Sequence, residues 1–472
     1  MKRLFLLVLF CPLMLFSADA RKPNIVFILI DDMGWSDLGC TGSDLFQTPN
    51  IDKLAARGMR FTNAYSTCTV CSPTRASILT GQYPARLHLT DWIPGHERPK
   101  APLKIPDWTQ KLTHDQPTIA ELLKRSGYVS ASIGKWHLGK EFPTDFGFDL
   151  NVGGCHMGQP PSYFAPYKIP TMKEGPDGEY LTDRQTDEAC RFIESSKDKP
   201  FFLYFPYYCV HTPLQAKKAL IEEYAAKIKP DSRHKNAKYA AMIQTLDKGI
   251  GKLLAKLDEL KIADNTIVIF TSDNGGLLQS TSNVPLRAGK GSAYEGGVRV
   301  PLIVLWPGVT PAGSLCEEPV ISVDHVPTLM ELAQVEVGQA QICDGVSLTP
   351  LLRNPKEKLK RDAIFWHYPH YHPGGATPYS AVRAGDWRLV EFFTDNHVEL
   401  YNLKDDVGEK NDLSEKMPEK TSELRKKLAE WRQSVGAQLP TKNADHVPGA
   451  PEKKGQAMFP GPEWYTAAGA LD

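Results

Sequence analysis

The sequence predicts an α/β protein in which helices sandwich a mixed, mostly parallel sheet, followed by a small C-terminal α+β unit. Three features of the 472-residue chain support this fold class: short apolar runs recur along it, helical patterns lie between them, and the composition changes after about residue 355. Strands alternating with helices predict a parallel sheet, because each parallel crossover has room for a helix. We therefore expect a first domain over residues 21–355 and a second over residues 356–472.

Five apolar runs have the length and composition of buried parallel strands. They are "NIVFILI" (24–30), "VSASIG" (129–134), "FFLYFPYY" (201–208), "NTIVIF" (265–270) and "VPLIVLW" (300–306). Two of the intervening helical patterns have proline in a first turn and glycine just past the end, namely Pro49 with Gly58 and Pro117 with Gly127. A longer helix with apolar residues at helical spacing is expected over residues 236–260.

The chain after residue 355 reads as short strands linked by turns rather than as strand–helix alternation. The strand segments are "AIFWHYP", "YSAVRAGDWRLVEFF" and "HVELYNL", and the charged helical segment "MPEKTSELRKKLAEWRQSV" follows them. They predict a small antiparallel sheet with one packed helix. The tail from about Thr441 is rich in Pro, Gly and Lys and is expected to run along the surface.

The charge balance and the N-terminus limit the function classes. The chain has 55 Lys and Arg against 55 Asp and Glu, so no electrostatic signal points to nucleic acid or to an anionic membrane. Residues 1–20 have a basic start, an apolar run and an Ala18-x-Ala20 end, the pattern of a secretory signal peptide cleaved near Ala20. No later segment is long and apolar enough to span a bilayer. We expect an exported chain, periplasmic or secreted.

The nine cysteines do not form a recognisable disulfide framework. Cys11 leaves with the signal peptide, and the spacing of the other eight shows no compact pattern. A domain of this size does not need disulfides for stability. If Cys71 is committed to chemistry, an odd number of cysteines remains, so at least one is free or paired between chains.

Polar side chains follow four of the predicted strands at the point where each strand ends. The carboxyl ends of parallel strands meet at one edge of a sheet, which is where open α/β proteins bind their ligands. We therefore expect a single site that collects the strand-end residues Asp31, Asp32, Lys135, His137, His211, Asp273 and Asn274.

The acidic and amide residues of this group indicate a metal. Asp31, Asp32, Asp273 and Asn274 offer only oxygen ligands, which suit Ca²⁺ or Mg²⁺ better than zinc. The alternative for each pair is local, because Asp31-Asp32 can cap a turn and Asp273-Asn274-Gly275 can form one. Since both pairs are expected at the same edge, we favour a metal site.

The segment "TCTVCSPTRASILTG" (67–81) places a cysteine at the start of a helix. Pro73 fits the first turn and Gly81 the stop, so Cys71 lies where free N–H groups and the helix dipole attract an anion. Arg75 is one turn further on, placed to pair with Cys71 or with a bound oxyanion.

Two alternatives for Cys71 remain open from the residues themselves. The cysteine can be a buried structural thiol, or it can form a zinc or redox pair with Cys68. Zinc would need two more soft ligands, and no second C-x-x-C exists. A thioredoxin-like pair should closely follow the first strand, which this one does not.

The ordered motifs resemble the formylglycine-dependent type I sulfatases of the alkaline-phosphatase-like superfamily. They are "ILIDDMGWSDLGCTG", "TCTVCSPTRASILTGQYPAR", "SIGKWHLG", "CVHTPL", "TSDNGG" and "GKGSAYEGGVRVP", and the resemblance covers nearly all of the mature chain. The C-x-P-x-R pentapeptide is the mark of the family, because a maturation enzyme reads it and oxidises its cysteine to formylglycine. Most members have Ser where this chain has Thr74, and we expect Thr74 to be tolerated. Cys68 lacks the downstream Pro and Arg and is expected to stay a thiol.

The resemblance implies a role for each matching residue. One Ca²⁺ would be held by Asp31, Asp32, Asp273, Asn274 and the modified Cys71. A hydroxyl of the hydrated aldehyde at position 71 would attack sulfur. Arg75 and Lys135 would position and neutralise the sulfate, and His137 would take the proton of the second hydroxyl as sulfate leaves. His211 and Lys290 would contact the bridging oxygen, with His211 as general acid.

The predicted activity is hydrolysis of a carbohydrate sulfate, in the manner of bacterial enzymes that act on carrageenan-like galactans or glycosaminoglycans. We expect a galacto-configured residue at an oligosaccharide end. Two loops are candidates for the sugar pocket, or alternatively for interdomain packing or a second metal site. The first, residues 86–99, offers Asp91, Trp92, His96 and Arg98; the second, residues 365–379, offers His367, His370 and His372.

Two other functions compete with this one. A phosphonate monoester hydrolase or phosphodiesterase of the same superfamily would share the fold and some metal ligands. A non-enzymatic, sugar-binding pseudosulfatase should have lost a catalytic residue, whereas Cys71, Lys135, His137, His211 and Lys290 are all present.

Overall fold

A mixed eight-stranded sheet forms the centre of the first domain. The structure, a computed structural model, describes residues 22–96, 98–335 and 341–448, so the predicted signal peptide lies outside the described residues. The strand order is β10-β2-β9-β8-β1-β7-β5-β6. The strands are β1 (Asn24–Ile30), β2 (Met59–Phe61), β5 (Val129–Ile133), β6 (Leu150–Val152), β7 (Phe201–Pro206), β8 (Thr266–Ser272), β9 (Leu302–Leu305) and β10 (Ser314–Cys316).

Strand β1 shows why these sequences are continuous apolar runs. It lies between β7 and β8, parallel to both, and all seven of its residues are buried. Alternate side chains point to opposite faces. Phe27 therefore joins the core on one side and Ile28 the core on the other. Each fully buried large apolar side chain contributes about 1.5–3 kcal/mol relative to an exposed one.

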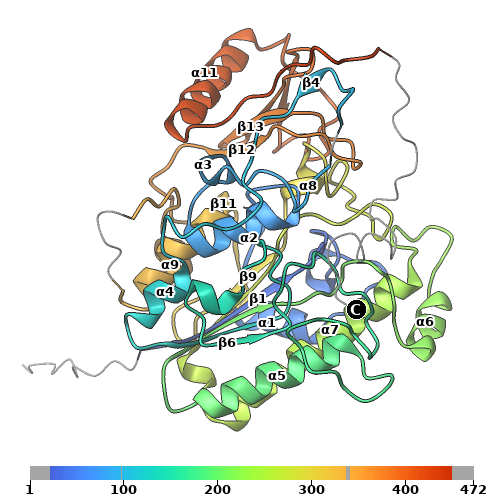
Figure 1. The fold of residues 1–472 in the computed structure, drawn as a ribbon, viewed down its shortest axis with the longest axis vertical. Helices are drawn as coiled ribbons and strands as arrows, with labels where there is room; N and C mark the ends of the chain where they lie inside the picture. Colours follow the sequence, from blue (N-terminus) through green and yellow to red (C-terminus); the bar gives the residue numbers. More distant parts are fainter. Residues whose placement is uncertain (1–21, 97, 336–340, 449–472) are drawn as a thin grey trace, which may run out of the picture.

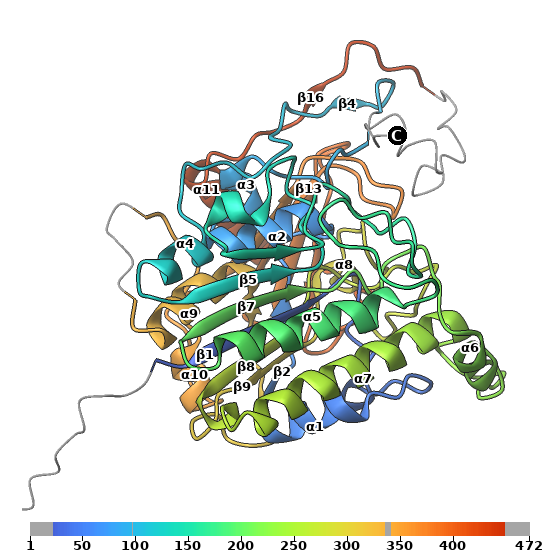
Figure 2. The same cartoon turned by 60° about the horizontal axis from the view of Figure 1, so that its bottom comes forward.

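Helices cover both faces of this sheet, as Figures 1 and 2 show. One face packs on α1 (Pro49–Arg57), α5 (Leu181–Ser196) and α7 (Ala237–Glu259). The other packs on α2 (Cys71–Thr80), α4 (Ile119–Lys124), α9 (His325–Leu332) and α10 (Thr349–Arg353). Helix α6 (Lys218–Ala225) packs on the same side as α7, and two four-residue helices, α3 (Pro84–Leu87) and α8 (Glu295–Val298), lie outside these layers. The predicted helix-covered, mostly parallel sheet is confirmed.

Two details of the prediction were wrong. Strand β9 was expected to be parallel, but it pairs antiparallel with both β8 and β2. An antiparallel neighbour needs no crossover, so the segment from β8 to β9 stays at the carboxyl end of β8. The helix expected to start with Pro117 begins instead at Ile119, because Thr118 caps it by accepting a hydrogen bond from the Glu121 N–H.

The C-terminal unit is an antiparallel four-stranded sheet packed against one helix, as predicted. Its elements are β12 (Ile364–Tyr368), β13 (Tyr379–Ala384), β14 (Trp387–Phe392), β15 (Val398–Asn402) and α11 (Pro418–Ser434). It lies beside the α2 face of the larger sheet in Figure 1. We keep the domain boundary near residue 355, between α10 and β12, as a proposal.

Two small strand pairs complete the structure. Strand β3 (Ala64–Tyr65) pairs parallel with β11 (Val320–Ile321). Strand β4 (Leu103–Lys104) pairs antiparallel with β16 (Thr441–Lys442). The segment predicted as a surface tail therefore begins as an exposed strand on the first domain, and its last part, residues 449–472, lies outside the described residues.

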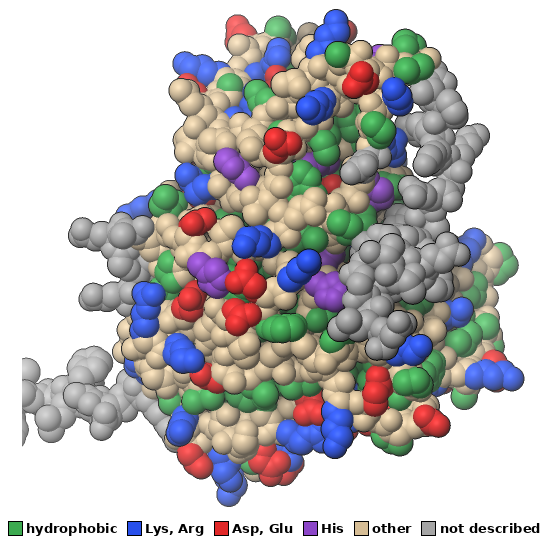
Figure 3. Space-filling model, viewed as in Figure 1, with side chains coloured by type: hydrophobic (Ala, Val, Ile, Leu, Met, Phe, Trp, Pro, Cys, Tyr) green, Lys and Arg blue, Asp and Glu red, His purple; other side chains and the backbone are tan. Residues whose placement is uncertain are grey.

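The surface and the thiols agree with the composition. Basic and acidic side chains are intermixed over the face shown in Figure 3. Among the described residues, no helix is long and apolar enough to cross a bilayer. The eight cysteines of the described chain are free, six of them buried.

Candidate active site

The predicted strand-end residues meet at one edge of the sheet. Strands β8, β1, β7 and β5 are parallel neighbours, so their carboxyl ends lie side by side. The segments that follow them supply Asp31, Asp32, Lys135, His137, His211, Asp273 and Asn274, all buried. The loop between β8 and β9 adds Lys290, and the start of α2 adds Cys71 and Arg75.

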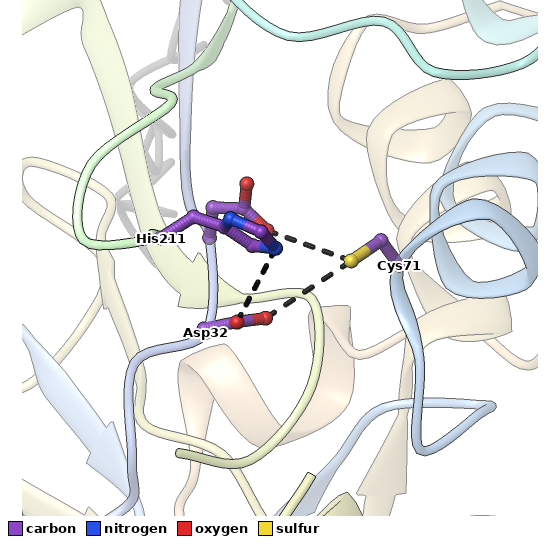
Figure 4. A group of neighbouring side chains, drawn as sticks. Asp32, Cys71 and His211 are labelled. Carbon is purple, nitrogen blue, oxygen red and sulfur yellow. Dashed lines mark hydrogen bonds and ion pairs between the residues drawn. The ribbon is translucent and has the colours of Figure 1, made fainter. Parts of the chain in front are cut away.

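Cys71 is the first residue of α2 and lies at the centre of the group. Its Sγ is 3.6 Å from Asp31 Oδ1, 4.0 Å from Asp32 Oδ1 and 3.4 Å from Lys290 Nζ. Figure 4 shows Cys71, Asp32 and His211 pointing toward one another from three different elements. The predicted helix start at Cys71 is therefore in place, and the thiol faces both carboxylates and a cation.

Asp32 is held as a carboxylate by its neighbours. Lys290 Nζ lies 2.7 Å from Asp32 Oδ1, and His211 Nε2 lies 3.6 Å from Asp32 Oδ2. Burial alone would raise the pKa of Asp32, but Lys290, His211 and Lys135 outweigh it and hold that pKa below its usual range. The same attraction raises the pKa of Lys290 above that of an ordinary lysine. Asp32 and Lys290 are thus a buried ion pair beside the thiol.

Arg75 and Lys135 neutralise the remaining carboxylates. Arg75 donates to Asp273 Oδ2 through Nε at 2.9 Å and forms a 2.7 Å ion pair with it through Nη2. Its Nη1 donates to the Lys135 carbonyl, and Lys135 Nζ lies 2.7 Å from Asp31 Oδ2. Arg75, expected to pair with Cys71 or an oxyanion, therefore pairs with carboxylates in this structure.

The two histidines have fixed orientations. His211 Nδ1 donates to the Thr212 carbonyl at 2.9 Å, which turns Nε2 toward Asp32 and toward Lys290 Nζ at 3.2 Å. His137 Nε2 lies 2.6 Å from the Ile93 carbonyl. Burial and the nearby Lys135 lower the pKa of His137 well below its usual value, so its imidazole is neutral.

Two site residues adopt left-handed backbone conformations. The φ angle is 63° at Asp32 and 58° at His137. Such angles cost energy for residues other than glycine and are concentrated at functional sites, where the surrounding structure enforces them. These two backbone conformations therefore lower the stability of the fold, and they direct both side chains into the site.

The donor set fits a hard divalent cation. Asp31, Asp32, Cys71 and His211 each bring one possible ligand atom to within 4.8 Å of the others. Asn274 Oδ1 is buried without a hydrogen-bond partner in the described chain, while its Nδ2 donates to Asp32 Oδ1 at 2.8 Å. An unsatisfied buried oxygen beside carboxylates suits Ca²⁺ or Mg²⁺. This group contains His211, which the sequence did not assign to a metal, whereas the expected ligand Asp273 is bound by Arg75.

Several contacts that hold the site were not foreseen. Thr69 Oγ1 accepts from the N–H groups of Gly291 and Ser292 at 2.9 and 3.1 Å, which fixes the segment carrying Lys290. Tyr163 donates its hydroxyl hydrogen to backbone carbonyls at His211 and Tyr208. These contacts join segments far apart in the chain, so no local sequence pattern predicts them.

The two predicted pocket loops meet next to this site. The rings of His96 and His372 are 5.5 Å apart, and Trp92 Nε1 donates to His96 Nδ1 at 3.0 Å. His372 lies against Gly291, where a Cβ would fall 1.8 Å from His372 Nδ1 and φ is 76°. Only glycine fits there, next to Lys290. Trp92, His96 and His372 are therefore placed beside the reactive group.

Asp91, Arg98 and His370 make contacts between the first loop and the C-terminal unit, whereas the partners of His367 lie within the C-terminal unit itself. Asp91 accepts from the Tyr368 hydroxyl, His370 bonds Thr90, and His367 bonds Ser380 and a backbone carbonyl. Arg98 lies 6.0 Å from the centre of the Tyr371 ring. Within the described ranges, no cluster of metal-type donors includes His367, His370 or His372.

Comparisons with known proteins agree with the geometry. The family model described as "Sulfatase" matches residues 23–335, and that described as "N-sulphoglucosamine sulphohydrolase, C-terminal" matches residues 289–434. A sulfatase of Formosa agariphila is 32% identical over 91% of this chain and 92% of its own length. The human N-acetylgalactosamine-6-sulfatase is 35% identical over 71% of this chain and 67% of its own.

A solved structure extends the similarity to three dimensions. The crystal structure of Ps i-CgsB in complex with k-i-k-neocarrahexaose superposes with a TM-score of 0.74 at 32% identity, covering 87% of this chain and 93% of that one. The fold is thus the alkaline-phosphatase-like fold expected from the motifs. The sheet, the residues at its strand ends and the family model agree. The chain therefore belongs to the sulfatase family and is a sulfuric ester hydrolase.

Proposed function

We propose that this protein hydrolyses a carbohydrate sulfate monoester through a formylglycine made from Cys71, with one bound Ca²⁺. One observation carries the proposal. The cysteine of a C-x-P-x-R sequence is the first residue of a helix and lies within 4.0 Å of two carboxylate oxygens and the Lys290 ammonium. The N-terminus of α2 favours negative charge at this position, which suits an attacking oxygen and a bound sulfate.

The modified residue supplies two hydroxyls on one carbon after hydration, one to attack sulfur and one to expel the sulfate afterwards. A plain cysteine or serine has no second hydroxyl. A maturation enzyme that reads Cys71, Pro73 and Arg75 is therefore an obligatory partner of this protein. Cys68 lies outside the pentapeptide and stays a buried thiol.

Three buried cations stabilise negative charge as the sulfate ester reacts. Lys135 and Arg75 neutralise the carboxylates around residue 71 and position the sulfate. Lys290, 3.4 Å from Cys71 Sγ and 3.2 Å from His211 Nε2, lies where the bridging oxygen gains charge. In a buried site, fixed cations of this kind are effective because water does not screen them.

His211 is the general acid and His137 the base. His211 Nε2 lies 3.6 Å from Asp32 Oδ2, on the side of the ring that faces residue 71, and is placed there to donate to the departing alcohol oxygen. His137 is neutral and buried, as a proton acceptor must be. Correctly placed acid–base groups contribute roughly 10²–10⁴-fold each to the rate.

Asp31, Asp32, Asn274, Asp273 and residue 71 are proposed to hold the Ca²⁺. When bound, the ion acts as a Lewis acid that orients the attacking oxygen and the sulfate. The unsatisfied Asn274 Oδ1 supports this assignment. Arg75 then keeps Asp273 in position through its two nitrogen contacts.

The substrate class follows from the loops beside the site. Aromatic and imidazole side chains such as Trp92, His96 and His372 suit the faces and hydroxyls of a sugar. The names of the similar proteins, a 6-sulfatase for N-acetylgalactosamine and a protein bound to a neocarrahexaose, support a sulfated oligosaccharide. We propose a galacto-configured residue at an oligosaccharide end, reached by the protein after export.

Activity assays test this proposal against its competitors. Protein made together with a maturation enzyme is assayed on sulfated galactan and glycosaminoglycan oligosaccharides and on a phosphonate monoester, with Cys71→Ala as the control. We expect sulfate release by the unmutated protein, loss of it after EGTA treatment, and its return on adding Ca²⁺. A higher kcat/KM on the phosphonate would favour the phosphonate hydrolase, and sugar binding without release by either protein would favour a pseudosulfatase.

A further inference from the structure

The His137 ring is held in one tautomer by a backbone carbonyl. A carbonyl oxygen only accepts hydrogen bonds, so the 2.6 Å contact between His137 Nε2 and Ile93 O requires a hydrogen on Nε2. In the neutral ring the other nitrogen, Nδ1, then carries a lone pair. Nδ1 is buried and has no hydrogen-bond partner among the described residues. The ring also packs on the backbone at Gly158, where a Cβ would fall 2.7 Å from its Cε1.

The backbone of Ile93 connects the base with the helix of the nucleophile. Its carbonyl accepts from His137, and its N–H donates to Ser72 Oγ at 3.2 Å. Ser72 directly follows Cys71 in α2. One residue in the loop after α3 thus contacts both His137 and the residue next to position 71.

This loop is anchored to the C-terminal sheet two residues earlier. Asp91 Oδ1 accepts from the Tyr368 hydroxyl at 2.7 Å and from the Trp92 N–H at 2.9 Å. Thr90 Oγ1 lies 2.8 Å from His370 Nε2. Asp91, Tyr368 and His370 are each 1% exposed. Contacts buried so completely define the position of the loop.

We propose that Tyr368 and Asp91 are positioning residues, which hold the Ile93 carbonyl so that His137 keeps its hydrogen on Nε2 and its Nδ1 free to accept a proton. The C-terminal unit then has a part in the chemistry although it supplies no reacting group. This inference rests on the proposed function, because it assigns Nδ1 as the atom through which His137 acts.

The step that depends on Nδ1 is the release of sulfate from residue 71. The O–H bond of the spare hydroxyl breaks and its proton goes to Nδ1. The electron pair of that bond becomes the second bond of the aldehyde carbonyl, and the bond from carbon to the sulfate oxygen breaks with its electrons on sulfate. Water then hydrates the aldehyde, and the imidazolium returns its extra proton to solvent. Cleavage of the substrate ester precedes this step and does not use His137.

Because the reaction has two steps, a defect confined to the second step gives a kinetic pattern that a general loss of active-site structure does not give. Slowing only the second step lowers kcat and KM by the same factor and leaves kcat/KM unchanged, because kcat/KM reports the steps up to alcohol release. It also produces a burst of alcohol equal to the enzyme concentration.

Tyr368→Phe removes only the hydroxyl that anchors Asp91. With 4-nitrophenyl sulfate we expect kcat and KM both to fall roughly tenfold, with a stoichiometric burst of nitrophenol. Asp91→Asn keeps an oxygen that accepts from Tyr368 and is expected to remain within about twofold of the unmutated protein. Tyr128→Phe is the matched control, because it also removes one tyrosine hydrogen bond, to the Pro23 carbonyl. Tyr128 precedes β5, at the opposite end from the site, so this variant should change none of these values.

The tautomer itself is measured without activity, in protein that keeps the Cys71 thiol. Histidine labelled with ¹⁵N is observed in long-range ¹H–¹⁵N spectra, and the His137 signals are identified by their loss in His137→Gln. We expect Nε2 to have the shift of a protonated nitrogen and Nδ1 that of an unprotonated one. Tyr368→Phe should move this ring toward a mixture of the two tautomers, whereas Tyr128→Phe should not.

The outcomes separate this inference from the proposed function. A protonated Nδ1 in the unmutated protein overturns the inference, as does a fall in kcat/KM for Tyr368→Phe with no burst. If the converted, unmutated protein releases sulfate from no ester tested, the proposed function fails, while the tautomer measurement still decides whether the Ile93 contact orients the ring.

Discussion

Two buried clusters in this protein both pair acidic with basic side chains but have different roles. The catalytic cluster collects Asp31, Asp32, Lys135 and Lys290 at the sheet edge. The second cluster lies between the domains, where Arg388 of β14 pairs with Glu409 and, at 3.5 Å, with Glu295 of α8. Glu295 also accepts from the Tyr65 hydroxyl at 2.8 Å, and Arg388 donates to the Ala293 carbonyl.

The difference lies in what each cluster leaves without a partner. In the Arg388 cluster the two atoms that lack a hydrogen bond to any described residue, Arg388 Nε and Glu295 Oε1, face each other as an ion pair at 3.5 Å, so this cluster closes on itself and joins β14 to α8. The catalytic cluster also balances its charges, but Asn274 Oδ1 and His137 Nδ1 keep free acceptor positions within the described structure. A buried polar atom without a partner costs free energy. At these two atoms an ion or a substrate would provide the missing partner and offset that cost.

The largest expected effect is on the catalytic cluster. Replacing Cys71 by alanine removes the proposed nucleophile but no large side chain, so the protein should fold and lose activity by at least about 10³-fold. The measurement is sulfate release at matched concentrations of folded protein. Cys68→Ala, three residues earlier, is the control and should keep its turnover. Comparable loss in both variants would mean that a packing defect, not the nucleophile, explains the effect.

The Arg388 cluster should respond in the opposite way. Arg388→Met leaves Glu409 buried without its cation and removes one of the two arginines that pair with Glu295, Arg299 being the other, so we expect the free energy of unfolding to fall by about 3–5 kcal/mol. The kcat of the remaining folded protein should change little. Urea denaturation and kinetics on the same sample measure both quantities.

An exposed ion pair of the same sheet provides the control. Arg425 pairs with Glu391 and its side chain is 47% exposed, so Arg425→Met should cost less than about 1 kcal/mol. A large loss of kcat with normal stability in Arg388→Met would contradict the division between the two clusters.

Asp91 is a third kind of buried charge: His370 Nδ1 lies 3.9 Å from its Oδ2, but no lysine or arginine of the described residues pairs with it. Burial raises the pKa of Asp91 from its ordinary value of 3.8 to about 7. The folded protein therefore binds a proton that the unfolded chain releases, and stability should decrease as pH rises between these two values. We expect a loss of about 2–4 kcal/mol over this interval that Asp91→Asn does not show. The measurement is the difference in unfolding free energy between the two proteins against pH. Parallel pH curves would contradict a raised pKa.

Thr74→Ser should have the smallest effect. The Thr74 hydroxyl bonds the backbone N–H and carbonyl of Cys68 and lies 3.4 Å from the Val70 carbonyl, and serine keeps these contacts. Loss of one buried methyl should cost about 1 kcal/mol of stability. Conversion of Cys71 and turnover should stay unchanged, as measured by peptide mass and sulfate release. Increased conversion in the variant would show that Thr74 limits recognition by the maturation enzyme.

The sequence predicted most of the fold because its main signals are local. The run from Asn24 to Ile30 is apolar throughout since both faces of β1 are covered, and the strand-end rule then placed Asp31 and His211 at one edge. The direction of β9 was not predictable in this way, because a buried strand has the same apolar pattern in either direction.

Other parts of the site depend on contacts between distant segments. Lys290 was identified only through the family resemblance, since it follows no strand. The sequence contains no pattern that predicts the contacts of the Ile93 carbonyl or the Tyr368 hydroxyl. The first is a backbone group, and the second is 277 residues away from its partner Asp91. Such contacts become visible only when the chain is folded.

The most direct test of the account is the chemical state of residue 71. Peptide mass spectrometry is applied to the segment containing Cys71, from protein produced together with a maturation enzyme. The formylglycine mechanism predicts the mass of an aldehyde in place of the thiol at Cys71, and an unmodified thiol at Cys68. An unmodified Cys71 in protein that nevertheless releases sulfate would contradict the formylglycine mechanism.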